Sequence, residues 1–188
     1  MDSDANIIPG PAIPECKEWF VMRDLTRSNA KSPAYKRVED MGIKVFTPMV
    51  WKLYEKQGKR CRKQIPYMHD LLFIFETREK VDYIVEQIPT LQYRYVRGAF
   101  CKPMTIRNID MERFIHAVEL AGNPRFYTPA EITAEMIGRK VKIIGGPLDG
   151  YEGFLQKVRG AKSKYLLVEL PSFLSVSVKI QPEFIQLL

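Results

Sequence analysis

Residues 141–158 read VKIIGGPLDGYEGFLQKV, two apolar runs joined by a glycine-rich turn. Gly146 and Pro147 predict a tight turn here, and Gly150 can supply the positive φ that such turns often need. Gly153 lies inside the second run, where a glycine permits the bend of a small barrel. The stretch therefore predicts two antiparallel strands joined by a turn of defined geometry.

The residues after this turn continue the same pattern to Leu188. Short apolar runs alternate with turn residues at 141–144, 151–158, 165–170, 174–180 and 184–187. Five short strands so close together fit a small closed barrel better than other architectures. We therefore expect a five-stranded β-barrel domain over residues 138–188.

A different pattern precedes this region. The stretch 18–23, EWFVMR, predicts a strand, and the apolar run 71–75, LLFIF, predicts a strand that is buried on both faces. The order of strands and helices predicts an α+β domain over residues 18–122, in which helices flank an antiparallel sheet. Apolar residues at helical spacing predict the helices near 33–41 with Ser32 as cap, near 78–88 with Thr77 as cap, and near 110–121 with a stop at Gly122.

Two stretches lack such periodicity. Residues 1–17 carry prolines and little apolar pattern, which predicts a flexible N-terminal tail. Residues 123–137 predict a linker, in which Thr128 and Glu131 have the spacing of a capping box and indicate a short connecting helix. The domains on either side of this linker are therefore expected to fold independently.

The positive charge is concentrated in one part of the chain. The 188 residues have a formal net charge of +7, which favours a polyanionic partner such as nucleic acid. Residues 52–63, a predicted hairpin tip, contain six basic residues and one acid, so they contribute +5 of this charge. Two interpretations are open. Either lysines protect an exposed hairpin from edge pairing, or the hairpin contacts nucleic acid through Lys59, Arg60, Arg62 and Lys63.

Motifs for catalysis or metal binding are missing from the sequence. It contains no Gly-x-Ser-x-Gly, no phosphate-binding loop and no paired set of cysteines and histidines. His69 beside Asp70 fits a turn better than an acid–base pair, since the other histidine, His116, lies in a predicted helix. We therefore expect no enzymatic activity, no metal and no cofactor.

The cysteines and the apolar runs bear on the cellular compartment. Cys16, Cys61 and Cys101 are odd in number and far apart, as expected for reduced thiols in a cytoplasm. The start of the chain lacks the basic and apolar segments of a signal peptide. The longest apolar run, 71–75, is too short to cross a membrane. We therefore expect a soluble, cytoplasmic protein without membrane association.

Two parts of the sequence resemble a known family. WFV at 19–21, a predicted helix and GIKVFTP at 42–48 resemble the opening of the N-terminal (NGN) domain of NusG proteins. The stretch 141–158 resembles a KOW motif, which ribosomal proteins also contain. Because both parts occur in the right order, residues 18–188 resemble the NusG family. VELP at 168–171 and the N-terminal extension are similar to UpxY-like and RfaH-like antiterminators, whereas IPYMHD at 65–70 departs from the family's Phe-Pro-Gly-Tyr-like turn.

The resemblance implies a transcription elongation factor or antiterminator that reduces pausing or termination. Its NGN-like domain would bind the clamp helices of RNA polymerase. Its KOW domain, an SH3-like barrel, would bind a second partner such as a ribosomal protein, a termination factor or RNA. The positions that match the polymerase-binding pattern are Val21, Arg23, Tyr67 and Tyr95, of which the first two share one face of a strand.

Two alternatives to this interpretation stay open. Tyr67 and Tyr95 fit a plain core role as well as a binding role, because large aromatic residues usually fill cores. The whole chain also fits a ribosome-associated or general RNA-binding protein that uses its KOW barrel and its basic hairpin.

Overall fold

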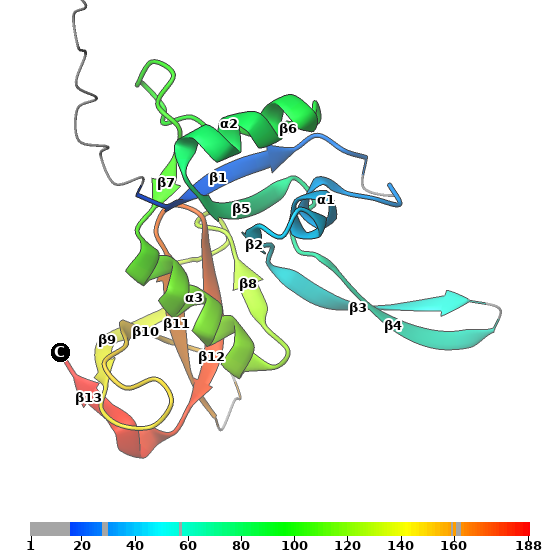
Figure 1. The fold of residues 1–188 in the computed structure, drawn as a ribbon. Helices are drawn as coiled ribbons and strands as arrows, with labels where there is room; N and C mark the ends of the chain where they lie inside the picture. The colour runs from blue at the N-terminus through cyan, green and yellow to red at the C-terminus, as the bar shows by residue number, and fades with distance from the viewer. Residues whose placement is uncertain (1–15, 28–29, 57, 159, 161–162) are drawn as a thin grey trace, which may run out of the picture.

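The computed structural model describes residues 16–27, 30–56, 58–158, 160 and 163–188, so the expected tail lies almost wholly outside the described residues. The N-terminal half contains an antiparallel sheet whose centre is formed by β1 and β5 (Figure 1). The strands follow the order β2 (Lys44–Phe46), β5 (Leu71–Glu76), β1 (Glu18–Asp24) and β6 (Leu91–Tyr93), and β7 (Thr105–Ile106) also pairs with β1.

Both faces of this sheet are covered, which explains the continuous apolar run of β5. Alternate residues such as Leu72 and Ile74 face α1 (Ala34–Asp40) and α2 (Arg78–Gln87). Leu71 and Phe73 face the opposite side, where they join the core around α3 (Asn108–Ala121). The prediction of a strand buried on both faces, between helices, is therefore confirmed.

The start of α1 differs from the prediction, in which Ser32 was the cap. The helix begins at Ala34, and no side chain of the local sequence caps it. Instead the Ala34 amide donates to Asp24 Oδ2 at 2.8 Å, while Asp24 Oδ1 accepts from the Thr26 amide at 2.8 Å. Asp24 lies at the end of β1 and is buried, so its carboxylate replaces the water that these amides would otherwise bind.

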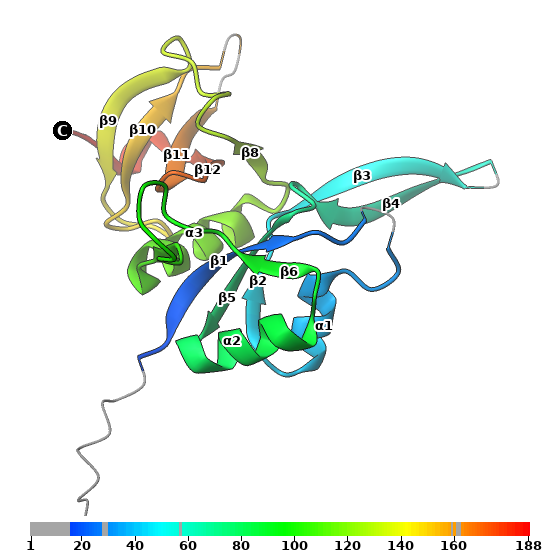
Figure 2. The ribbon, with the colours of Figure 1, turned by 90° about the horizontal axis from the view of Figure 1, so that it is seen from above.

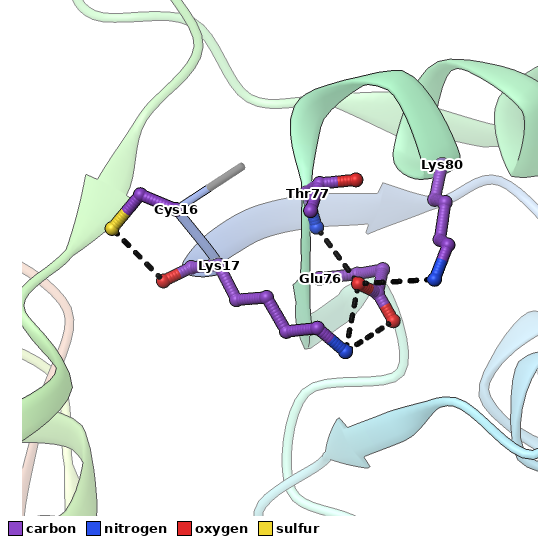
Figure 3. A network of polar contacts seen from close by, with 5 residues as sticks. All are labelled: Cys16, Lys17, Glu76, Thr77 and Lys80. Atoms are coloured by element: carbon purple, nitrogen blue, oxygen red, sulfur yellow. Dashed lines mark hydrogen bonds and ion pairs between the residues drawn. The ribbon is translucent and has the colours of Figure 1, made fainter. Parts of the chain in front are cut away.

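Thr77 is the N-cap residue of α2, as predicted, but its side chain makes no cap bond. The carboxylate of Glu76 accepts from the Thr77 amide at 3.1 Å (Figure 3). Lys17 Nζ lies 3.0 Å from both carboxylate oxygens, and Lys80 Nζ lies 3.7 Å from Oε1. Burial opposes ionisation of Glu76, but the contacts with Lys17, Thr77 and Lys80 outweigh it and lower the pKa of this carboxyl group.

The C-terminal half contains a second antiparallel sheet. All five expected strands are present, and a sixth, β8, comes from the stretch expected to be a linker. β8 and β13 lie at the two ends of the strand order, and no pairing between described strands closes the sheet into a barrel. The strands follow the order β13 (Ile185–Leu187), β9 (Ile137–Ile143), β10 (Glu152–Gln156), β11 (Lys164–Leu170), β12 (Leu174–Ile180) and β8 (Arg125–Tyr127).

The connecting helix expected before β9 does not form, and residues 128–136 make turns instead. One of the two capping-box contacts, the bond from the Thr128 amide to the Glu131 carboxylate, is nevertheless present. Glu131 Oε2 accepts from the Thr128 amide at 2.7 Å and from the Thr128 hydroxyl at 2.8 Å. These contacts therefore stabilise a turn, in which the Glu131 amide also donates to the Thr128 carbonyl at 3.0 Å.

The helix α3 lies between the two sheets and contacts β1 on one side and β11 and β12 on the other (Figures 1 and 2). Its buried residues Met111 and Phe114 belong to one apolar core with Phe73 of the first sheet and Val176 of the second. The cores of the two halves are therefore continuous.

Candidate functional site

The face of the first sheet that carries Val21 and Arg23 is the first candidate site. Alternation along β1 directs both side chains to the side of α3 and the C-terminal half. Val21 is fully buried there, whereas the Arg23 side chain is 55% exposed at the end of the strand. The structure thus confirms the shared face, but only one of the two side chains is accessible.

Asp70 links Arg23 to a neighbouring strand. Its Oδ2 atom lies 3.5 Å from Arg23 Nε and accepts a hydrogen bond from the Arg94 guanidinium at 2.9 Å. The Asp70 carbonyl also accepts from the Asp24 amide at 3.1 Å. Sequence reasoning assigned Asp70 to a turn and missed this ion pair, because no spacing rule relates residue 70 to residue 23.

Tyr67 lies at the edge of the same face, just after β4 (Lys59–Pro66). Its hydroxyl donates to Glu131 Oε2 at 2.9 Å, and its ring centroid lies 5.4 Å from that of Phe126 in β8. Burial, followed by the hydrogen bond to Glu131, raises the pKa of Tyr67 to about 12. Tyr67 is therefore half-buried, and the segment that holds it belongs to the connection with the C-terminal half.

Tyr95 does not join this group. Tyr93 pairs with Met22 in the register and packs in the core beneath α2, on the opposite face from Val21. The ring of Tyr95 lies 6.1 Å from the ring of Tyr93 and is 51% exposed. The structure therefore brings Val21, Arg23 and Tyr67 to one face and leaves Tyr95 apart from them.

The C-terminal half covers the face that carries Val21 and Tyr67. Phe173, in the turn between β11 and β12, places its ring edge-on to Phe73 at 6.0 Å. At the other end of the contact, the Tyr151 hydroxyl donates to the Arg113 carbonyl of α3 at 3.2 Å and lies 2.9 Å from His116 Nδ1. Access to this face thus requires the β11–β12 turn to move.

The second candidate site is the two-stranded ribbon formed by β3 (Met49–Lys56) and β4, which extends away from both sheets (Figures 1 and 2). The turn is shorter than predicted, with Gly58 at φ 74°. The four predicted nucleic-acid residues therefore lie along β4 instead of at the tip. These residues are Lys59, Arg60, Arg62 and Lys63, and all are exposed.

The predicted turn at 141–158 joins β9 to β10 and contains Gly146, Pro147 and Gly150. Gly150 has φ 76°, and its amide donates to the Ile143 carbonyl at 2.9 Å, as the turn prediction requires. Gly153 lies where two strands approach each other closely. A Cβ atom there would lie 2.4 Å from the Leu167 carbonyl oxygen, so the glycine permits close approach of β11.

Within the described ranges, no group of three or more His, Cys, Asp or Glu residues could hold a metal ion. No helix in this part of the chain is long and apolar enough to span a bilayer. Cys16, Cys61 and Cys101 are all free.

Comparisons with known proteins give one family. A family model described as "Transcription termination factor nusG" matches residues 17–115, which are 99 of the 188 residues. No curated protein matches the chain. One solved structure, described as "Domain interaction in Thermotoga maritima NusG", is 17% identical with a TM-score of 0.44, and the alignment covers 91% of this chain and 97% of that one. The family assignment rests on the sequence match.

Proposed function

The chain belongs to the NusG family, and on that premise we propose that it is a transcription elongation factor whose N-terminal half binds RNA polymerase. In this proposal it acts in the cytoplasm as a specialised factor of the UpxY-like or RfaH-like type and reduces pausing or termination. It has no enzymatic activity, because it works by occupying a surface of the polymerase. The observation that carries the proposal is the sheet face around Val21, Arg23 and Tyr67.

This face has the composition of a protein-binding patch. Val21 and its neighbours supply an apolar centre, Tyr67 an aromatic side chain, and Arg23 a charge at the rim. A coiled coil such as the clamp helices presents a ridge of apolar and charged side chains, which such a patch complements. We therefore assign the clamp-helix site to this face and exclude Tyr95, which lies on the other side of the sheet.

The proposed function includes an opening step, since the same face contacts Phe173 and the segment around Glu131. Only molecules in which the C-terminal half has moved can bind polymerase through it. The apparent Kd is then the intrinsic Kd divided by the open fraction, so a mostly closed protein binds weakly.

The C-terminal half has its own proposed role. We assign residues 138–188 to a KOW domain that binds a second partner, either a ribosomal protein, a termination factor or RNA. Support comes from the Gly146–Gly150 turn, whose hydrogen bond to Ile143 and positive φ fit the motif. Residues 18–122 are then the NGN-like domain, and residues 123–137 are a linker whose strand β8 pairs with the sheet of the C-terminal half.

The alternative function is a ribosome-associated or general RNA-binding protein, which the exposed basic ribbon favours. Co-purification of the tagged full-length chain with core RNA polymerase from a nuclease-treated lysate separates the two functions. The polymerase proposal predicts a complex that survives nuclease treatment, because protein contacts hold it. Loss of polymerase from the treated sample, with ribosomal RNA or proteins in the untreated one, would support the alternative instead.

A further inference from the structure

The two faces of the β3–β4 ribbon differ in chemistry, which the linear sequence conceals. Residues directly opposite each other in an antiparallel pair share a face. We call one side the lysine face, which carries Lys52, Tyr54, Lys59, Cys61 and Lys63. We call the other side the arginine face, which carries Trp51, Leu53, Glu55, Arg60, Arg62 and Gln64.

The lysine face is a concentration of uncompensated charge. Lys52 lies directly opposite Lys63. Lys59 lies on the same face, nearer to the turn of the ribbon, beyond the Tyr54–Cys61 pair. Like charges directly opposite each other weaken a strand pair. None of the three ammonium groups makes an ion pair with an acid among the described residues, and the face itself carries no acid. This arrangement opposes folding of the ribbon and favours an anionic partner.

One of the two arginines of the arginine face is already engaged within the ribbon, and the other lies opposite an acid. The Arg62 guanidinium lies over the Trp51 ring at 4.8 Å, a cation–π contact. Arg60 lies opposite Glu55, whose carboxylate offsets one positive charge. Among the residues whose side chains the structure describes, two arginines and one glutamate leave +1 on this face, against +3 on the lysine face. Leu53 adds an apolar side chain that is 68% exposed. The arginine face is therefore the poorer match for a polyanion.

Resting on the proposed role in transcription, we propose that the ribbon binds the phosphate backbone of nucleic acid through its lysine face alone. Lys52, Lys59 and Lys63 pair with phosphates, and the half-exposed Tyr54 ring lies among them, where it can stack on a base or sugar. The proposal separates the four residues that the sequence predicted to bind nucleic acid into two groups. Lys59 and Lys63 belong to the site, Arg60 and Arg62 do not, and Lys52 replaces them.

The dimensions of the ribbon fit both forms of nucleic acid. Lys59 and Lys63 are four residues apart on one strand, roughly 13 Å, so the lysine face spans several phosphates. The ribbon stands clear of both sheets, and a two-stranded ribbon is narrow enough to enter a major groove. The same face can follow the backbone of a displaced single strand. In both cases the ligand that the lysine face would bind is a row of backbone phosphates.

The test uses the full-length protein and two matched double variants, each of which removes two positive charges from the ribbon. One variant is Lys52→Gln with Lys63→Gln, and the control is Arg60→Gln with Arg62→Gln. Binding to fluorescent oligonucleotides, duplex and single-stranded, is measured by anisotropy over a range of salt concentrations. Each lost phosphate contact lowers the log–log salt slope by about 0.9 for duplex DNA and about 0.7 for a single strand.

On the form of oligonucleotide that the protein binds, we expect the log–log salt slope of the lysine variant to fall by about 1.8 for duplex DNA or by about 1.4 for a single strand. The arginine variant should keep the slope of the unmodified chain. Lys52→Arg with Lys63→Arg should restore it, because charge is the requirement. Equal slope losses in both variants, a loss confined to the arginine variant, or no oligonucleotide binding by the unmodified chain would each overturn the proposal. Nuclease-resistant binding of the same variants to polymerase reports separately on the proposed function.

Discussion

Glu76 is a nearly buried charged residue at the junction of three parts of the N-terminal fold. Its side chain is 8% exposed, and it joins Lys17, the Thr77 amide and Lys80, so it connects β1 and β5 to the start of α2. These contacts favour the ionised form and lower the pKa of Glu76 below its ordinary value. The stability they contribute is fully present above the ordinary pKa and is lost as the pH falls through the lower pKa of the folded state.

We predict that Glu76→Gln lowers the free energy of unfolding by about 2 kcal/mol at neutral pH, as expected for a loss of hydrogen bonds to a charged group. The difference from the unmodified chain should shrink as the pH falls through the acid range. Urea denaturation at several pH values measures both effects. A difference that is independent of pH would show that Glu76 stabilises the fold by shape and not by charge.

Single residues also mark where sequence reasoning reached its limit. Val21 and Arg23 could be assigned to one face, because alternation along a strand is a local property. The partner of Arg23, Asp70, and the cap of α1, Asp24, could not be predicted, because each contact depends on tertiary structure. The family pattern placed Tyr95 with Val21 in one polymerase-binding site. The register of β6 on β1, in which Tyr93 pairs with Met22, shows that Tyr95 and Val21 lie on different faces.

At the scale of elements, the sequence predicted the long periodic ones and missed the short strand β8. α3 and β5 have apolar patterns long enough to identify their type, and both were predicted. β8 contains only three residues, and its strand conformation depends on pairing with β12, which follows almost 50 residues later. The strand expected over 91–97 ends at Tyr93, because the next part of the β1 edge, at Phe20 and Trp19, pairs with β7 instead.

Gly153 provides a test at the scale of the strand pair. In Gly153→Ala the new Cβ atom meets the backbone oxygen of Leu167, which cannot rotate away, so β10 and β11 must separate. We predict a loss of about 3 kcal/mol in the free energy of unfolding. Gly150→Ala is the control, since it has free space around the Cβ position and bears only the strain of a positive φ, about 1 kcal/mol. Similar losses in urea denaturation would contradict the close approach of the strands.

At the scale of the whole molecule, one continuous core links two halves that the sequence suggested would be independent. Periodicity could indicate each sheet, but it carried no information on contacts such as Phe73 with Phe173 or Tyr67 with Glu131. These contacts cover the face that we assign to polymerase. The strength of polymerase binding is therefore coupled to the stability of the contact between the halves.

The most direct measurement is the affinity of the full-length chain and its variants for purified core RNA polymerase, with circular dichroism to confirm folding. Phe173→Ala removes the ring that lies against Phe73. We therefore expect a larger open fraction and about tenfold tighter binding, the equivalent of about 1.4 kcal/mol. In that background Tyr67→Ala should weaken binding by about 2 kcal/mol, as a hot-spot residue does, and Tyr95→Ala should leave it unchanged. Equal affinities for the unmodified chain and Phe173→Ala, or equal effects of the two tyrosine variants, would contradict the account.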